Sequence, residues 1–482
     1  MGTVNVDDLV NDLDADQYRA VTTPSRLVAV IAGAGSGKTR VLTRRVAYRL
    51  ATETATASHT LALTFTRQAA GELKRRLASL GQAHQITAGT FHSICLHLLQ
   101  QRWADRDRPA LRVLDDRSRV LGDLIKELSS RLDGTAVDLI SEIDWATGRA
   151  LDGRHYLLTA RHEGRRPRVP PDQVAMVLDR YVDLKRRRNL IDLDDILSLT
   201  ATEIDRDPTY AATVRWRYRH LLVDEAQDLN PLQHQIITLL SAGSGDLFLV
   251  GDPAQAIYGF NGADPRLLTE VETRFPGVEI IRLPSNYRSV PEIVSTGAHV
   301  LTTSNHNSQV KAVREPDPAV EVMSHDDDLA EAQAVADLVA QTNPSLIQSG
   351  NVAILARTHA ALAPVRGLLS QRDIAIHQPA DGGRTPLGVL LREVYRAESA
   401  DKLRRLSFDL ADKATANDDQ FHAVSGAITA FIQQTPDGDG AQFKTWVAAT
   451  DPFSMTQAGV ELLTFHAAKG REWHTVHLIG CE

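Results

Sequence analysis

Short apolar runs alternate along the chain with stretches in which apolar residues recur every three or four positions. Residues 27–32 read LVAVIA and residues 220–223 read HLLV, and both runs suit buried strands. Residues 40–50, RVLTRRVAYRL, carry their apolar residues at helical spacing. Alternating strands and helices predict an α/β fold with open parallel sheets.

A glycine-rich loop joins the first strand to this helix in the sequence AGAGSGKT. The order of strand, glycine loop, Lys-Thr and helix is that of the P-loop of nucleotide hydrolases. Lys38 is expected to reach the β- and γ-phosphates, and Thr39 to offer its hydroxyl to Mg²⁺. The alternative is a glycine turn that caps a helix. The residues predicted to bind nucleotide here are Ala32, Gly33, Ala34, Gly35, Ser36, Gly37, Lys38, Thr39 and Arg40, with Ala32 in the place of the usual first glycine.

The second apolar run leads directly into two acids, in the sequence HLLVDEAQD. Asp224 is predicted to bind Mg²⁺, and Glu225 to orient and deprotonate an attacking water. A solvated acidic turn is the alternative. The P-loop upstream favours a site for nucleotide hydrolysis with a bound metal ion.

Composition limits the possible classes of protein. A length of 482 residues predicts three or four domains. The net charge of −8 argues against a surface devoted wholly to nucleic acid, although a local basic channel remains compatible with it. Cys95 and Cys481 are too few for a disulfide framework, and neither a signal peptide nor a membrane-spanning run is recognisable. A cytoplasmic protein, associated with the nucleoid if bacterial, is expected.

The segments DEAQD and GDPAQAIYGFNGA (251–263) together resemble the UvrD/PcrA/Rep group of superfamily 1 DNA helicases. Other segments follow in the order of that family and extend the resemblance over nearly the whole chain. They are LDADQ (13–17), ALTFTRQAAGELKRRL (62–77), GTFHSIC (89–95), NLIDLDDIL (189–197), LPSNYRS (283–289) and LLTFHAAKGREW (462–473).

The resemblance implies further contacts to ATP. Gln255 would sense the γ-phosphate, and Arg288 would act as an arginine finger supplied in cis. Gln17 would read the adenine, and Tyr287 would stack on its ring. A surface ion pair is the alternative for Arg288. Gly470 and Glu472 would lie in a loop that contacts the ribose, so that the implied ligands are ATP and Mg²⁺.

The resemblance also implies a channel for single-stranded DNA. Tyr258 and Phe260 would stack on passing bases, and their place in the loop of Gln255 would link nucleotide state to DNA grip. Both rings could instead belong to the core, and the channel histidines could be structural. Phe260 and Asn261 stand where the family usually has Trp-Arg. The full predicted channel is Phe65, Thr66, His92, Tyr258, Phe260, Asn261, Thr464 and His466.

The domain organisation expected from these segments has two motor domains, each interrupted by an insertion. The first motor domain would comprise residues 1–92 and 200–280, with a helical insertion at 93–199. The second would comprise 281–380 and 458–482, with a reduced helical insertion at 381–457. Because the chain stops in an apparent strand, a truncation before the last helicase motif is expected.

The function predicted from the sequence is that of an ATP-dependent DNA helicase moving 3′ to 5′ along single-stranded DNA, in repair or replication. Its expected partners are single-stranded DNA, junctions of single- and double-stranded DNA, and unidentified repair or replication proteins, but no membrane. Two alternatives remain open. One is a nucleotide- and DNA-binding fragment without turnover, and the other is the motor of a helicase–nuclease complex or a protein-stripping translocase.

Overall fold

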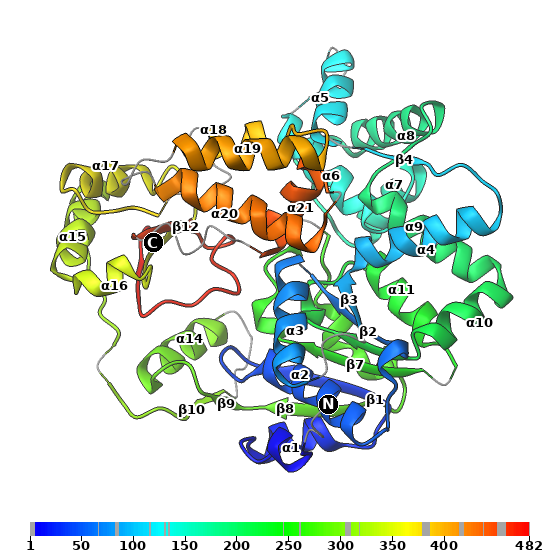
Figure 1. Ribbon diagram of the computed structural model, residues 1–482, viewed down its shortest axis with the longest axis horizontal. Coiled ribbons are helices and arrows are strands. Elements are labelled where there is room, and N and C mark those ends of the chain that lie inside the picture. The colour runs from blue at the N-terminus through cyan, green and yellow to red at the C-terminus, as the bar shows by residue number, and fades with distance from the viewer. Residues whose placement is uncertain are drawn as a thin grey trace. The chain divides into compact units, whose positions relative to one another are not determined.

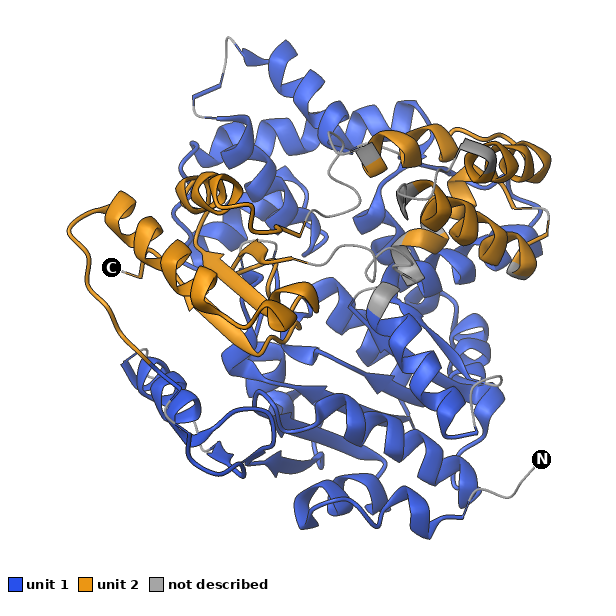
Figure 2. Cartoon of the chain, turned by 60° about the vertical axis from the view of Figure 1, so that its left-hand side comes forward, with its two compact units in different colours: residues 1–320 blue, residues 321–482 orange. Residues whose placement is uncertain are grey.

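The computed structural model describes most of the chain in two compact units, residues 1–320 and 321–482 (Figure 2). The described residues are 5–65, 67–81, 86–114, 117–129, 132–133, 135–243, 245–259, 262–303, 310–317, 319–377, 386–413, 419–436, 438–450 and 459–481. Each unit has its own parallel sheet, so the predicted α/β class is confirmed.

Unit 1 is built on a six-stranded parallel sheet with the strand order β3-β2-β6-β7-β1-β8 (Figure 1). The strands are β1 (Leu27–Ala32), β2 (Thr60–Thr64), β3 (Thr87–Thr90), β6 (His220–Val223), β7 (Asp246–Gly251) and β8 (Glu279–Leu283). In register, Ile31 lies opposite Gly251, and Ala32 lies opposite Leu283. Because every pairing is parallel, the carboxyl ends of all six strands lie at one edge of the sheet.

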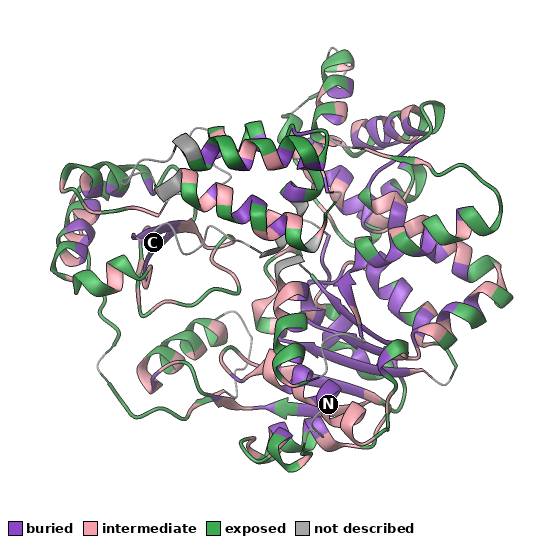
Figure 3. Cartoon of the chain, in the orientation of Figure 1, coloured by how far each residue is buried: buried purple, intermediate pink, exposed green. Residues whose placement is uncertain are grey.

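Helices cover both faces of this sheet, and the strands between them are buried (Figure 3). Successive residues of β1 serve different cores: Ala29 packs into one, and Val28 and Val30 into the other. The first core adds side chains from α4 (Phe91–Asp105), α9 (Leu193–Arg206), α10 (Pro208–Arg217) and α11 (Pro231–Ser241). The second adds α1 (Ala15–Thr22), α2 (Lys38–Ala51) and α3 (Arg67–Ser79).

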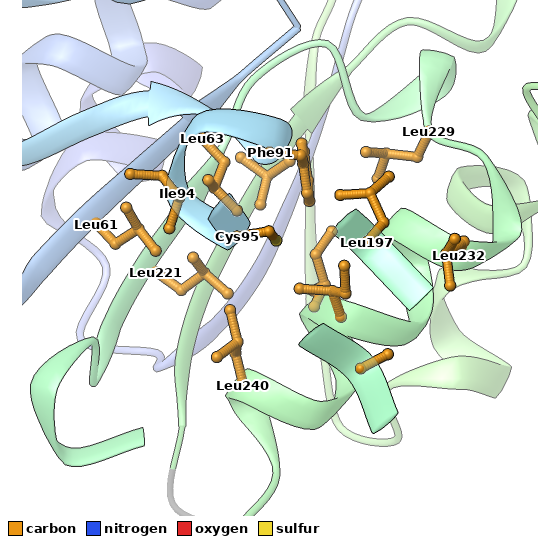
Figure 4. Close-up of a cluster of buried hydrophobic side chains, with 14 of the residues drawn as sticks. Leu61, Leu63, Phe91, Ile94, Cys95, Leu197, Leu221, Leu229, Leu232 and Leu240 are labelled. Atoms are coloured by element: carbon orange, nitrogen blue, oxygen red, sulfur yellow. The ribbon is translucent and has the colours of Figure 1, made fainter. Parts of the chain in front are cut away.

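The two cysteines have different surroundings. Cys95 lies on α4 in the first core, among Phe91, Ile94 and Leu221 (Figure 4). Burial raises the pKa of its thiol to about 12, against a weaker opposing effect of a hydrogen bond with Thr200. Cys481 is exposed, and neither cysteine is in a disulfide.

A helical segment between β3 and β6 has a hydrophobic cluster of its own, drawn from α5 to α8. These helices are α5 (Arg117–Glu127), α6 (Ala136–Thr147), α7 (Gly153–His162) and α8 (Pro171–Arg187), and β4 (Arg112–Val113) pairs with β5 (Leu190–Ile191) beside them. A buried ammonium, Lys185, joins α8 to the start of α9 through Asp192 at 2.8 Å and Asp195 at 2.5 Å.

The remaining described α-helices and strands of unit 1 follow β7 and β8. They are α12 (Arg266–Thr269), α13 (Val271–Arg274), α14 (Pro291–Thr303) and the pair β9 (Ser285–Asn286) with β10 (Lys311–Ala312). The chain up to residue 320 therefore belongs to the same compact unit as the first sheet. The domain boundaries expected from the sequence, including the one at 280/281, stay predictions.

Unit 2 contains a three-stranded parallel sheet, β12-β11-β13, and two hydrophobic clusters. Its strands are β11 (Val352–Ala356), β12 (Glu461–Thr464) and β13 (Thr475–Leu478). They pack with α15 (Asp328–Gln341), α16 (Pro344–Gln348) and α17 (Ala363–Gln371). The second cluster joins α18 (Pro386–Val394), α19 (Ala400–Lys413), α20 (Asp419–Gln434) and α21 (Gly440–Thr450). No described helix of either unit has the length and apolarity to cross a membrane.

Arg45, on α2, is a buried cation that holds the end of α1. It is 1% exposed, and its guanidinium donates to four carbonyl oxygens between residues 20 and 25, at 2.9 to 3.3 Å. The guanidinium also lies 4.7 Å from the ring centre of Phe248. Burial lowers its pKa to about 10. The bonds to Ala20 and Val21 satisfy carbonyls that the end of a helix leaves without intrahelical partners, and the other two hold the chain just beyond the helix.

Replacing Arg45 with methionine should lower the free energy of unfolding by about 3 kcal/mol, because the substitution leaves several buried carbonyls without donors. Thermal and urea unfolding of the purified chain measure this loss. Arg26→Met, at an exposed position, is the matched control and should change stability by less than about 0.5 kcal/mol. Equal stability of the two variants would contradict the capping role.

Candidate functional site

The predicted P-loop forms the turn between β1 and α2. Gly35 and Gly37 have φ angles of 69° and 85°, and Gly37 is the residue that precedes the first turn of α2. Only glycine adopts these angles without strain, and they curve the backbone toward the helix N-terminus. Ala32, which replaces the usual first glycine, is the buried last residue of β1. An alanine is suited to this extended position.

The side chain of Lys38 folds back over the loop. Its Nζ donates to the carbonyl oxygens of Ala32 at 3.2 Å and Gly33 at 3.4 Å. The ammonium thus lies at the carboxyl end of β1, where a phosphate bound in the loop would meet it. Arg40, also predicted to bind nucleotide, forms an ion pair with Asp12.

Gln17 is buried against the P-loop from the start of α1. Its Nε2 donates to the carbonyl oxygen of Ser36 at 2.9 Å, and its backbone N–H donates to Asp14 Oδ1 at 2.7 Å. Asp14 Oδ2 in turn accepts a hydrogen bond from the hydroxyl of Tyr287. The two residues predicted to bind adenine are therefore joined through one carboxylate.

The segment 285–289 packs on the P-loop through an asparagine that the sequence reasoning missed. Asn286 is 4% exposed, and its Nδ2 donates to the carbonyl oxygen of Ala34 at 2.8 Å. Its Oδ1 accepts from the backbone N–H of Arg288 at 2.9 Å. The backbone N–H of Tyr287 donates to Gly35 O at 2.9 Å. These bonds hold the backbone of Arg288 beside the loop, and the only signal in the sequence was the position of Asn286 just before the Tyr-Arg pair.

Asp224 and Glu225 follow β6 at the same edge of the sheet. Burial, and then the charge of Glu225, raises the pKa of Asp224 to about 7. Glu225 has a left-handed backbone with a φ of 53°, which is uncommon for a residue other than glycine. Two neighbouring carboxyls of this kind suit a site in which a cation offsets their charge.

Gln255 is tied to the end of β7 by a second buried acid. Its Nε2 donates to Asp252 Oδ2 at 2.8 Å, and Asp252 Oδ1 accepts from the N–H of Ala254 at 3.0 Å. Burial raises the pKa of Asp252, and the positive charge of Lys38 opposes that rise. Gln227, fully buried, connects Asp252 to Glu225. The sequence reasoning missed both Gln227 and Asp252.

This edge of the sheet fits a nucleoside triphosphate with a divalent cation. Backbone N–H groups and the Lys38 ammonium suit phosphate oxygens, and the charge of Lys38 acts on the pKa of both buried acids. Thr39 and Asp224 are the residues that could hold the cation. Among the described residues, no cluster of three or more His, Cys, Asp or Glu marks a separate metal site.

Two of the predicted DNA-binding aromatics are in contact. Phe65 follows β2, Tyr258 lies in the loop of Gln255, and their rings stack with centres 5.5 Å apart and planes 12° apart. Phe65 is 38% exposed and Tyr258 is half-buried, so this pair lies at the surface of unit 1. Burial lowers the pKa of His92, and the negative charge of Asp194 opposes that decrease. Thr66, Phe260 and Asn261 lie outside the described residues.

The remaining predicted residues belong to unit 2. Thr464 ends β12, and the turn that follows carries His466, Gly470 and Glu472, with a φ of 80° at Gly470. An ion pair at 2.6 Å between Arg471 and Glu461 ties this turn to its own strand. That these residues join the site of unit 1 stays a prediction.

The chain is similar in sequence to known helicases. Residues 13–276 match the family described as UvrD/REP helicase N-terminal domain. The chain is 31% identical over 516 aligned positions to the ATP-dependent DNA helicase UvrD2 of Mycobacterium tuberculosis, covering 98% of this chain and 73% of that relative. The chain belongs to the UvrD/REP helicase family. It is also 33% identical to DNA helicase II of Escherichia coli over 315 residues, covering 63% of this chain and 42% of that relative.

The family match includes the P-loop, both acids after β6 and the loop of Gln255, but it ends before Tyr287 and Arg288. The match to UvrD1 of Mycobacterium bovis, 31% identical over 382 residues, covers 74% of this chain and 48% of that relative. Membership of the UvrD/REP family thus rests on a match that includes five of the six strands of the unit 1 sheet, all but β8, and on a relative aligned over 98% of the chain.

Gly35→Ala should weaken binding of a fluorescent ATP analogue by about ten-fold or more. An alanine is strained in the left-handed conformation of this residue, and its Cβ would crowd the neighbouring side chains. The added carbon would lie 2.8 Å from Asn286 side-chain atoms and from Arg288 Cβ. Gly277→Ala is the matched control: its φ of 83° gives the same backbone strain, but the added carbon meets open space. Equal nucleotide affinity of the two variants would show that the contact between the P-loop and segment 285–289 does not matter for binding.

Proposed function

We propose that this protein is an ATP-dependent DNA helicase that moves 3′ to 5′ along single-stranded DNA and separates the duplex ahead of it. The observation that carries the proposal is the shared edge of the sheet in unit 1. The P-loop, the two acids after β6 and the loop of Gln255 lie there, and three residues beyond Gln255 the same loop carries Tyr258 stacked on Phe65.

For hydrolysis, the roles follow from position and charge. Lys38 would neutralise charge on the β- and γ-phosphates, and Glu225 would orient and deprotonate the attacking water. Gln255 would sense the γ-phosphate, and Arg288 would stabilise the charge that develops on it. A bound Mg²⁺ would polarise the phosphate oxygens. We infer that Gln17 and Tyr287 bind the adenine, and that Gly470 and Glu472 contribute from a second motor domain.

For movement, the short loop between β7 and α12 would connect the two ligands. A base entering between or beside Phe65 and Tyr258 gains stacking energy of about 1–3 kcal/mol, whatever its identity. A displacement of Gln255 on hydrolysis would move Tyr258, because only two residues separate them. The proposed channel also includes Thr66, His92, Phe260, Asn261, Thr464 and His466.

The proposed setting is cytoplasmic DNA repair or replication, with single-stranded DNA and junctions as substrates. The names of the relatives, ATP-dependent DNA helicase UvrD2 and DNA helicase II, support helicase activity on DNA. The polarity of movement and the protein partners rest on the family resemblance.

Steady-state ATP hydrolysis by the 482-residue chain, with and without a single-stranded oligonucleotide, tests the proposal directly. We expect strong stimulation by DNA and its loss in Lys38→Ala, which removes the charge that meets the phosphates. Hydrolysis that DNA does not stimulate would contradict a coupled motor. Nucleotide binding without any turnover would favour a binding protein.

Strand separation on duplexes with a single-stranded tail at one end distinguishes polarity. A 3′ tail should support unwinding and a 5′ tail should not. Stimulated hydrolysis without strand separation on either substrate would favour a protein-stripping translocase or the motor of a larger complex.

Phe65→Ala and Tyr258→Ala should each lower affinity for single-stranded DNA by about ten-fold, corresponding to the loss of one stacked base. Fluorescence anisotropy with a labelled oligothymidine measures the change. Trp216→Ala is the matched control, because Trp216 is another exposed ring in contact with an aromatic neighbour, His59, but lies before β6 at the opposite edge of the sheet. An equal loss in all three variants would argue against a channel at Phe65 and Tyr258.

A further inference from the structure

Gln227 is the most deeply buried polar side chain near the acids that follow β6. It is 0% exposed and lies in the short 3-10 helix Ala226–Asp228. Its Nε2 donates to Glu225 Oε2 at 2.6 Å, and its Oε1 accepts from the backbone N–H of Asp252 at 2.9 Å. A longer contact of 3.4 Å joins the same nitrogen to Asp228 Oδ2. One amide therefore contacts two segments of the chain.

The chemistry of the partners fixes the direction of this amide. The backbone N–H of Asp252 can only donate, so the oxygen of Gln227 must face it, and the nitrogen must face the carboxylates. A bond from an amide N–H to a carboxylate is charge-assisted and stronger than a neutral one. Of the side chains of this length, glutamate lacks the donor and methionine lacks both groups. A glutamine is therefore the side chain that satisfies both sides.

The backbone around Gln227 leaves its amide little freedom. A Cβ added to Gly251 would come within 2.7 Å of Gln227 Oε1, so this oxygen lies directly against the end of β7. On the other side, Glu225 has its left-handed backbone. Such a conformation persists when the surroundings hold it in place, and it directs the carboxylate differently from an ordinary helical or extended residue.

The hydrogen bonds continue from Gln227 to the loop of Gln255. Asp252, whose N–H binds Gln227, accepts from Gln255 Nε2 at 2.8 Å. Three hydrogen bonds thus connect the Glu225 carboxylate to the Gln255 amide through residues that are all part of unit 1. The distance between these two groups is set by one buried amide and one buried carboxyl.

We propose that Gln227 is a positioning residue for ATP hydrolysis: it aims the carboxylate of Glu225 and fixes the loop of Gln255 at a set distance from it. The inference rests on the proposed function, because it assigns Gln227 to the reaction in which Glu225 activates water. This role needs no contact between Gln227 and ATP or the attacking water, because the two ends of its amide bind Glu225 and Asp252. It acts through Glu225 and Asp252.

The test compares Gln227→Glu and Gln227→Met with the wild-type chain. Gln227→Glu keeps an acceptor for the N–H of Asp252 but places a further carboxyl beside Glu225. Gln227→Met removes both hydrogen bonds while the side chain keeps nearly the same volume. We expect kcat for DNA-stimulated ATP hydrolysis to fall by about ten- to a hundred-fold, since small misplacements of a reacting group have effects of this size. The dissociation constant of a fluorescent ATP analogue should stay within about three-fold, because Gln227 does not contact nucleotide.

Gln233→Glu is the matched control for the change from amide to carboxyl. Gln233 is also buried, at 5% exposure, but its side chain closes the N-terminal cap of α11 with Asn230. A glutamate serves equally well in such a capping box, so this variant should keep the wild-type kcat. Thermal unfolding of all the variants separates loss of fold from loss of turnover.

A double-mutant cycle with Glu225→Gln distinguishes positioning from general structural support. If Gln227 acts in part through the carboxylate, Gln227→Met should lower the residual turnover of Glu225→Gln by clearly less than it lowers the turnover of the wild-type chain. The inference would be overturned if the two substitutions lowered turnover independently, so that their effects multiplied in the double variant. It would also be overturned if both Gln227 variants kept a kcat within about two-fold of wild type, or if their affinity for nucleotide fell as much as their kcat. An inactive wild-type chain would overturn the proposed function as well, whereas active wild type with active variants would overturn only this inference.

Discussion

The parallel pairing of β1 with β7 on one side and β8 on the other is the constraint on which the candidate site depends. Five consecutive residues of β1, from Leu27 to Ile31, lie opposite residues 247–251 in register. Because the strands run in the same direction, the loops that leave them begin at the same edge. If β1 were shifted by two residues along β7, the P-loop would move by nearly 7 Å relative to Asp252, because each strand residue spans about 3.3 Å. The hydrophobic side chains of β1 on both faces of the sheet oppose such a shift.

The same edge gathers polar groups in an environment that disfavours them. Burial raises the pKa of the Asp224 and Asp252 carboxyls, and the Lys38 ammonium beside them donates to the backbone carbonyls of Ala32 and Gly33. Such an arrangement costs folding free energy, which the two cores of unit 1 must offset. Binding of a phosphate and a cation would relieve both costs together, so ligand should raise the stability of unit 1 as well as fill its site.

Much of this architecture was accessible from the sequence, because the relevant signals are local. The strand, glycine loop and helix around Lys38 are consecutive, and an apolar run ending at Asp224 needs no distant partner to be recognised. Gln227 and Asn286 were missed because their roles arise from bonds to backbone atoms 25 and 252 residues away. No periodicity encodes such pairs. The parallel pairing of Glu279–Leu283 with β1 was not apparent either, because it joins segments that are far apart in the sequence.

The contrast between the two cysteines makes the chain selective toward thiol reagents. Cys95 is held in the first core as a protonated thiol, whereas Cys481 is exposed near the end of unit 2. A maleimide dye added to the folded protein would attach at Cys481 and leave Cys95 untouched, because the reactive species is the thiolate. The native chain thus offers a single labelling position, in the unit that does not contain the six-stranded sheet. Attachment of a second dye would report that the core of unit 1 has opened.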